Sequence, residues 1–438
     1  MSTPTNTSSL LKYGILALPL AFGGIPLYLY APDFYATEVG LSLASLGALL
    51  LVLRLVDAAS DPLWGWLTDH WPNRRTTILN IAFAAYLFGF VALFNPVEGA
   101  GMLWFAMAIL FATCGYSLLV IQLNALGASW SSNQLDLVGI NSVREGFGLM
   151  GLIFAAVTPA ILLNYFSKGQ AFTFITIALV ALLILSHRCL FSWLSHRNQT
   201  PTELSSTTKG YTRSAKTVIW PARAFFATYG LSTLASACPA VLIVFFVRDY
   251  LDLEAWTGVF LILYFFSGIA FMPLWKLIAG RFGSTFAWAA SMLLAIITFS
   301  GVLLLSAGDF LGFALVCFFS GMAFGAELVI PPTILAQYLH RSNALAQAGI
   351  AYSLLAFLSK LALALSAGLL FWILEINQFT PAAQNDESAK LMLLYCYGLA
   401  PLVLKLIALF VLLTFRGNKA NETNDIQGVL YMDRSYDY

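Results

Sequence analysis

The sequence predicts an all-α membrane protein with about twelve membrane-spanning helices in two six-helix halves, and three observations support this. Of the 438 residues, 60% are hydrophobic and only 10% are charged, whereas an ordinary soluble domain has roughly a quarter of its residues charged. The apolar residues form repeated runs of about twenty residues, the length that crosses ~30 Å of hydrocarbon. One long polar stretch rich in Ser and Thr divides these runs into two sets.

The apolar runs predict where each span begins and ends. The spans of the first half are expected at 13–30, 42–67, 77–94, 102–126, 140–163 and 171–191. Those of the second half are expected at 222–247, 256–278, 287–305, 310–330, 346–374 and 391–413. We therefore expect an N-terminal six-helix bundle at 1–192, a central cytoplasmic loop at 193–220, a C-terminal six-helix bundle at 221–415 and a cytoplasmic tail at 416–438.

The basic residues predict the orientation in the membrane. With the N-terminus inside, most of the 22 Lys and Arg residues lie in cytoplasmic loops and termini, and the opposite side holds only Lys168, Arg248 and Lys390. Because cytoplasmic loops are enriched in Lys and Arg, both termini are expected in the cytoplasm, with the chain in a bacterial-type inner membrane. The net charge of +1 gives no sign of a nucleic-acid partner. The expected partners of a monomeric chain are membrane lipid and a small-molecule solute.

The sequence offers no motif for catalysis. The five cysteines each stand alone in an apolar run, which is typical of packing residues rather than of metal or disulfide pairs. There is no nucleophile elbow or phosphate-binding loop. An enzyme is therefore not expected, and neither is a cofactor or a metal site beyond a coupling ion.

Charged residues inside a span are functional candidates, because an ionised group at the bilayer centre costs at least ~2.5 to 3.5 kcal/mol. In the second span, Asp57 and Asp61 lie four residues apart and share one helix face, with Arg54 one turn before Asp57. The two carboxylates repel, and a bound monovalent cation, a shared proton or a nearby base would relieve the repulsion. The simpler interpretation is that Arg54 neutralises Asp57, but one arginine cannot balance two acids.

The eleventh span carries a deep lysine. Lys360 lies fourteen residues into it, roughly 21 Å along the helix at 1.5 Å per residue, so its ammonium cannot easily reach water. We expect it to pair with Asp57 and Asp61 and to compete with an external cation for them.

Other polar residues within the spans allow two interpretations each. Glu327 in the tenth span could serve a proton relay or a cytoplasmic gate, or could form a structural pair. Arg144, near the cytoplasmic end of the fifth span, is an interfacial anchor or contacts the substrate or a gate. Lys405 is expected to snorkel or pack. Gln122 and Asn124 are neutral and can hydrogen-bond a solute or another helix.

The loop after the second span reads GWLTDHWPNRR, which is close to the major facilitator pattern of Gly, three residues, Asp and a basic cluster, although Pro72 replaces the usual glycine. An acid at a helix end and arginines in the next turn can latch neighbouring helices and release them as the halves move. A degenerate copy around Arg281 follows the eighth span and supports an internal repeat. The residues assigned to a cytoplasmic gate are Gly65, Asp69, Arg74, Arg75, Arg281 and Glu327.

These motifs resemble the glycoside-pentoside-hexuronide:cation symporters, the melibiose permease group of the major facilitator superfamily. The resemblance runs over nearly the whole chain and rests on Tyr13-Gly14, Gly40 to Ser42, Arg54 to Pro62, Asn124 to Gly127, Arg144, Pro273 to Trp275, Pro331-Pro332 and Tyr352 to Lys360. It implies the major facilitator fold, two pseudo-symmetric bundles, and Na⁺- or H⁺-coupled symport of a small, sugar-like solute by alternating access.

Carried over by position, the resemblance implies a cation site, with Na⁺ as the single candidate metal. Its residues would be Asp57, Ser60, Asp61 and Ser117, with Lys360 beside them. The substrate cavity is assigned to Arg54, Gln122, Asn124, Arg144 and Tyr352.

One departure from the family pattern concerns the solute. Members that carry galactosides have carboxylates where this chain has Ala21 and Val120. Because a buried sugar hydroxyl without a partner costs ~1 to 3 kcal/mol, this chain is expected to bind a galactoside poorly. The paired aspartates and the lysine also resemble those of the lysophospholipid symporters of vertebrates. The alternatives that stay open are a translocator of a lipid-like amphiphile and an efflux antiporter on the same fold. A channel is disfavoured, because it does not require the repeated halves and the gate pattern.

Overall fold

The structure is a computed structural model that describes residues 6–198 and 218–417, and every regular element in these ranges is helical. Eleven helical segments of the described chain are long and apolar enough to cross a membrane. A further helix, α4 (Leu43–His70), is long enough at 28 residues but carries Arg54, Asp57 and Asp61. The prediction of an all-α, multi-pass membrane protein is confirmed.

Contacts divide the chain into two compact units. Unit 1 comprises Met1–Ser132, Gly139–Ser214 and Leu345–Ala356, and unit 2 comprises Asn133–Val138, Ala215–Ala344 and Phe357–Tyr438. The short segments 133–138 and 345–356 therefore group with the unit that the other half of the sequence mainly builds. The predicted division at 1–192, 193–220, 221–415 and 416–438 stays a prediction, and most of the predicted loop and tail lies outside the described residues.

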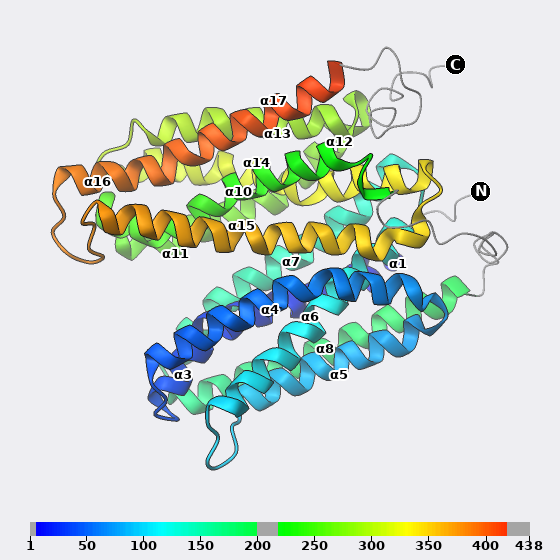
Figure 1. Cartoon of the computed structure of the whole chain (residues 1–438), viewed down its shortest axis with the longest axis horizontal. Helices are drawn as coiled ribbons and strands as arrows, with labels where there is room; N and C mark the ends of the chain where they lie inside the picture. The colour runs from blue at the N-terminus through cyan, green and yellow to red at the C-terminus, as the bar shows by residue number, and fades with distance from the viewer. Residues whose placement is uncertain (1–5, 199–217, 418–438) are drawn as a thin grey trace. The chain divides into compact units, whose positions relative to one another are not determined.

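Unit 1 is built from long helices that pack side by side. They are α4, α5 (Arg75–Phe94), α6 (Met102–Ala128), most of α7 (Gln134–Leu162) and α8 (Lys168–Asn198). Helix α6 packs along α5 and also against α4, while α5 contacts α8 (Figure 1). Aromatic rings fill the core between them, and Phe94 stacks on Phe172 with ring centroids 4.7 Å apart. This packing holds the polar face of α4 against α6.

The first span is not one regular helix. It consists of α1 (Thr7–Gly14), α2 (Ala17–Ile25), the π-helical segment η1 (Pro26–Tyr30) and α3 (Ala31–Thr37). Proline lacks the N–H that an α-helix needs in its interior, and the chain widens into a π turn at Pro26, whose carbonyl accepts from the N–H of Ala31.

Helix α8 continues to Asn198, so the first residues of the predicted loop are helical. The helix continues beyond the predicted end of the apolar span at residue 191, and Trp193 belongs to the core. Its ring lies 5.4 Å from that of Tyr13 and 4.7 Å from that of Trp130, measured between centroids. These aromatic contacts stabilise the last turns of the helix.

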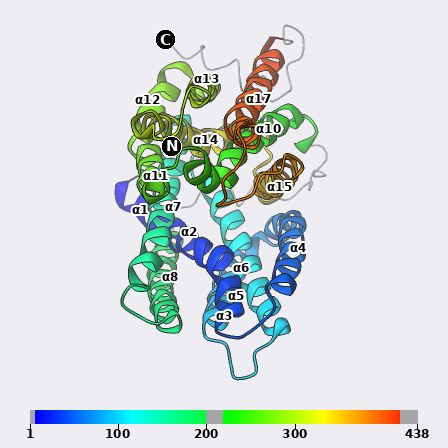
Figure 2. The ribbon, with the colours of Figure 1, turned by 90° about the vertical axis from the view of Figure 1, so that its left-hand side faces the viewer.

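Unit 2 contains the remaining helices. They are α10 (Arg223–Phe245), η4 (Phe246–Tyr250), α11 (Thr257–Ala270), α12 (Met272–Phe282), α13 (Ser284–Val302), α14 (Phe310–Arg341), most of α15 (Ala348–Ile376), α16 (Glu387–Leu394), η7 (Tyr395–Leu399) and α17 (Ala400–Gly417). Helix α10 packs against α17, and α14 packs against both α11 and α13 (Figure 2). Helices α10, α14 and α17 carry Ser232, Glu327 and Lys405, which contact one another directly or through Lys405.

Candidate transport site

The two aspartates of α4 are buried in unit 1. Asp57 is 4% exposed and Asp61 is fully buried. The hydroxyl of Ser117 on α6 donates to Oδ1 of Asp57 at 3.0 Å. The packing of α4 on α6 therefore brings together three of the four residues predicted for the cation site.

Ser60, the fourth predicted residue, uses its hydroxyl within its own helix. It donates to the backbone carbonyl of Asp57 at 2.8 Å and accepts from Nε1 of Trp64 at 3.0 Å. The hydroxyl stays close to the acid pair, but these two bonds already orient it.

The structure shows one contact of Arg54. Its guanidinium lies over the ring of Tyr28, 4.9 Å from the ring centroid. The alternative in which Arg54 neutralises Asp57 stays a prediction. Its predicted role in a substrate cavity stays a prediction.

Lys360 belongs to unit 2, whereas Asp57 and Asp61 belong to unit 1. Its side chain is partly buried on α15. The predicted pairing of this lysine with the two aspartates stays a prediction.

Arg144 lies well inside α7, not at its start, because the helix begins at Gln134. The side chain is buried, and its Nη2 and Nε atoms lie 2.6 and 2.9 Å from Oε1 of Glu145. The interpretation of Arg144 as an interfacial anchor is thus unsupported. Sequence reasoning missed Glu145, although an acid next to a buried arginine was the available signal.

The polar residues of α6 fall into two kinds. The Gln122 side chain is completely buried, and neither amide atom has a hydrogen-bond partner among the described residues. Asn124 instead donates to the carbonyl of Val120 in its own helix at 2.9 Å. Gln122 is therefore the one of these two residues whose buried amide atoms are unbonded among the described residues, and a solute or a buried water could bond to them. Tyr352, also assigned to the cavity, is buried in the short α15 segment that groups with unit 1.

The predicted gate residue Asp69 binds the beginning of α15 inside unit 1. Its carboxylate oxygens accept from the backbone N–H groups of Gly349 and Ile350 at 2.7 and 2.8 Å. Gly65, one turn earlier, permits this close approach, since a Cβ there would lie 2.6 Å from the carbonyl oxygen of Gly349. The glycine and the acid of the sequence pattern thus hold the end of α4 against the beginning of α15.

A related contact exists in unit 2, near the degenerate copy of the pattern. Nε2 of Gln134, at the start of α7, donates to the carbonyl of Ala279 and to the hydroxyl of Ser284, both at 2.9 Å. Between these two acceptors lies Gly283, whose φ of 88° favours glycine. The sequence did not single out Gln134, because a lone glutamine at a helix start is not distinctive.

The other residues assigned to the gate make less specific contacts. Arg74 is exposed and ends the 3₁₀ turn Pro72–Arg74, and Arg75 begins α5. Arg281 lies over the ring of its neighbour Phe282. Their gate role stays a prediction.

Glu327 lies away from these helix ends and forms an ion pair with Lys405 in unit 2. Of the two alternatives for Lys405, snorkelling and packing, its buried side chain supports packing. Its ammonium donates to the carbonyl and hydroxyl oxygens of Ser232 and to the hydroxyl of Ser236, at 3.0, 2.8 and 3.0 Å. For Glu327 the structure thus shows a buried pair, the structural alternative that its sequence position left open.

Comparisons with known proteins show which family the chain matches. The model of the MFS/sugar transport protein family matches residues 12–419. The isoprimeverose transporter of Lactiplantibacillus pentosus is 29% identical over 160 residues, which cover 35% of this chain and 33% of that protein. An uncharacterized symporter of Bacillus subtilis is 28% identical over 160 residues, covering 35% and 34%. The matched stretch thus spans about a third of each relative.

Solved structures of low sequence identity share the fold. A bacterial homologue of the iron transporter ferroportin, in an outward-facing state, has a TM-score of 0.71 at 15% identity, covering 93% of this chain and 98% of that one. The human organic anion transporter MFSD10 has a TM-score of 0.62 at 15% identity, covering 92% and 98%. These likenesses confirm the predicted major facilitator fold and carry no information on the solute.

The resemblance drawn from the acid pair and the gate pattern is therefore confirmed at the level of the family. Because the family model matches nearly the entire chain, the protein is a transporter rather than an enzyme. The chain belongs to the MFS/sugar transport protein family of the major facilitator superfamily.

Proposed function

We propose that the chain is a secondary active transporter that couples the symport of a small organic solute to Na⁺ or H⁺ by alternating access. The observation that carries the proposal is the buried acid pair of α4, in which Ser117 donates to Asp57 one turn before Asp61. Two carboxylates on one buried helix face favour binding of a cation or a proton, because either one reduces their repulsion. A hydroxyl and carboxylates also supply the oxygen ligands that hard cations prefer.

The solute is proposed to contact Gln122 and Arg144. A buried amide without a partner costs ~1 to 3 kcal/mol, so a solute that bonds the side chain of Gln122 would gain that free energy. Arg144 presents a planar group that can bind hydroxyl or anionic oxygens, while Glu145 compensates its charge. A glycoside-like solute is the leading proposal, because one similar protein is an isoprimeverose transporter.

An amphiphilic solute is the second candidate, and the apolar side chains of Ala21 and Val120 favour it. They stand at positions where the galactoside carriers that this chain resembles have a carboxylate. A solute with an apolar part and a polar or anionic head would not need an acceptor at those positions.

Uptake into proteoliposomes tests both the coupling and the solute. The labelled solutes are isoprimeverose, melibiose and lysophosphatidylcholine, each with an imposed Na⁺ gradient, an imposed H⁺ gradient or none. We expect gradient-driven accumulation of one solute by the wild type and its loss in Asp57→Asn. The matched control is Asp252→Asn, an exposed acid with φ of 56° that asparagine also adopts.

Accumulation by Asp57→Asn at the wild-type level would overturn the proposed cation site. Accumulation of lysophosphatidylcholine alone would replace the glycoside proposal by the amphiphile, and outward pumping would replace symport by efflux. The same vesicles would show whether Na⁺ or H⁺ is the coupling ion.

The membrane placement and the gate are part of the same proposal. We place the protein as a monomer in an inner membrane with both termini in the cytoplasm, following the basic residues of the loops. The contact of Asp69 with Gly349 and Ile350 would then close the cytoplasmic ends of α4 and α15 in one transport state. Reporter fusions at the two termini test the orientation.

A further inference from the structure

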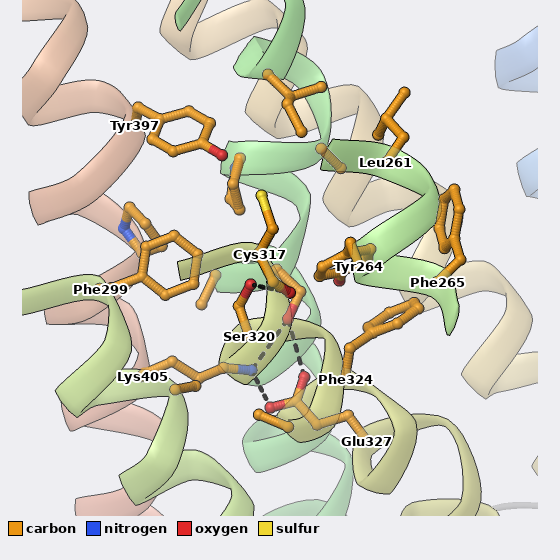
Figure 3. Close-up of a pocket in the computed structure, with 18 residues that line it drawn as sticks. Leu261, Tyr264, Phe265, Phe299, Cys317, Ser320, Phe324, Glu327, Tyr397 and Lys405 are labelled. Carbon is orange, nitrogen blue, oxygen red and sulfur yellow. Dashed lines mark hydrogen bonds and ion pairs between the residues drawn. The ribbon is translucent and has the colours of Figure 1, made fainter. Parts of the chain in front are cut away.

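A cavity of about 190 Å³ lies inside unit 2, among α10, α11, α13, α14 and α17. Figure 3 shows Phe299 and Tyr397 on one side of it and Tyr264 and Phe265 on the other. The buried pair of Glu327 and Lys405 lies at one end. The cavity is therefore an aromatic chamber with a single strongly polar end.

The size of the cavity limits what it can hold. An apolar cavity of ~150 Å³ is enough to bind benzene, so a volume of about 190 Å³ accommodates one six-membered ring. Whole small-molecule pockets usually measure ~300 to 1,000 Å³. Water is disfavoured over most of this volume, because each buried water needs two to four polar partners and the rings of Phe265, Phe299 and Phe324 offer none.

The two members of the ion pair differ in how fully they are bonded. An ammonium has three donors, and Lys405 has four oxygens around it: two of Ser232, one of Ser236 and one of Glu327. A carboxylate has about four acceptor positions. Among the described residues, Glu327 receives only the ammonium and the hydroxyl of Ser236, the latter at 2.9 Å. Glu327 therefore has acceptor positions left over, and the polar end of the cavity can take a further hydrogen-bond donor.

The charge balance decides which donor fits. Glu327 and Lys405 together are neutral, so a charged ligand would add an uncompensated charge to a buried site, which is costly. A neutral hydroxyl adds a donor without adding a charge. A fully hydroxylated sugar ring would leave most of its hydroxyls unbonded against the aromatic walls.

We propose that this cavity binds one neutral, largely apolar ring whose hydroxyl donates to Glu327. The inference depends on the proposed function in one respect, since it takes the ring to be part of a transported solute, such as the aglycone of a glycoside. Glu327 would supply the acceptor for the hydroxyl of that ring within unit 2.

Ligand-observed ¹⁹F NMR on the full chain in phospholipid nanodiscs tests the proposal. The probes are 4-fluorophenol, which has a hydroxyl donor, 4-fluoroanisole, which has the same ring without the donor, and 4-fluorobenzylammonium, which is a cation. We expect 4-fluorophenol to bind at least tenfold more tightly than either of the other two.

Two variants locate the binding. Glu327→Ala removes the acceptor, and Ala323→Phe places a ring of the protein into the cavity that Ala323 lines. Each is expected to weaken 4-fluorophenol binding at least tenfold. Glu254→Gln, on the exposed surface of the same unit, controls for the loss of a carboxylate and for partitioning of the probe into lipid.

Equal binding of 4-fluorophenol and 4-fluoroanisole would overturn the role of Glu327, and unchanged binding in Ala323→Phe would overturn the cavity as the site. Ala323→Phe still decides the question if Glu327→Ala does not fold. The measurement uses no ion gradient. Failure of this inference therefore leaves uptake that depends on Asp57 unaffected, and failure of coupled uptake leaves ring binding unaffected.

Discussion

Each unit of this transporter buries carboxylates, and in each a serine of a neighbouring helix donates to one. In unit 1, Ser117 of α6 donates to Asp57 of α4 at 3.0 Å. In unit 2, Ser236 of α10 donates to Glu327 of α14 at 2.9 Å. The units differ in the buried charged residue that accompanies this carboxylate. In unit 1 it is the acid Asp61, one helical turn after Asp57, and in unit 2 it is the base Lys405, which pairs with Glu327.

That difference predicts two kinds of chemistry. An acid pair gains from a cation that arrives and leaves, because its repulsion changes with occupancy. An acid and a base held in one bundle are already neutral, so they favour a neutral ligand and also depend on each other for stability. Unit 1 is thus suited to ion coupling, whereas the pair in unit 2 suits a permanent polar contact beside an apolar cavity.

The largest effect on transport is expected from neutralising the acid pair. Asp61→Asn removes a fully buried carboxylate and should lower gradient-driven accumulation roughly 10- to 100-fold, the loss of a charged interaction worth about 1.5 to 3 kcal/mol. Initial rates with and without the gradient separate coupling from binding. If Glu327→Gln abolished the ion dependence of uptake and Asp61→Asn did not, the site of ion coupling would lie in unit 2 and not in unit 1.

The largest effect on stability is expected in unit 2. Lys405→Met leaves Glu327 buried without its base and should lower the apparent free energy of unfolding by ~3 to 5 kcal/mol. Adding Glu327→Leu should recover most of this loss, because an apolar pair can replace a buried ion pair. Thermal unfolding in detergent measures both variants, with the exposed Lys276→Met as control. Additive losses in the double variant would show that the pair is not coupled.

The two serines allow a matched test of intermediate size. Ser117→Ala and Ser236→Ala each remove one hydroxyl donor from a carboxylate, a bond worth roughly 1.5 to 3 kcal/mol. Ser117→Ala is expected to weaken the coupling ion about tenfold or more, as read from the ion dependence of uptake. Ser236→Ala is expected to lower the melting temperature and to leave the ion dependence unchanged. The same shift in ion dependence for both would contradict the contrast between the units.

The smallest effect is expected at the helix contact of unit 1. Gly65→Ala places a Cβ 2.6 Å from the carbonyl of Gly349, and overpacking of this kind costs ~1 to 3 kcal/mol. Uptake should fall several-fold, because the end of α4 can no longer approach α15. Gly24→Ala is the matched control, since a Cβ there meets nothing within 4 Å. Equal uptake by the two variants would show that transport does not require the close contact between Gly65 and Gly349.

Some of the site was accessible from residue spacing alone. Asp57 and Asp61 share a face because they lie one helical turn apart, and Asp69 follows Gly65 in a pattern that holds two helices together. The limits of the spans were less accessible. Helix α8 outlasts its apolar run because Trp193 packs on Tyr13 and Trp130, and such contacts between distant residues leave no periodic signal.

The membrane class, the family pattern and the acid pair could all be predicted from the residues alone, because they depend on hydropathy, on local spacing and on the cost of charge in lipid. Three features of the packing could not: Lys405 is buried against Glu327, Ser117 reaches Asp57, and Gln122 has no partner among the described residues. Each of these depends on which faces of separate helices meet. Hydropathy shows that a helix is buried in the membrane but does not show which neighbour covers each of its faces.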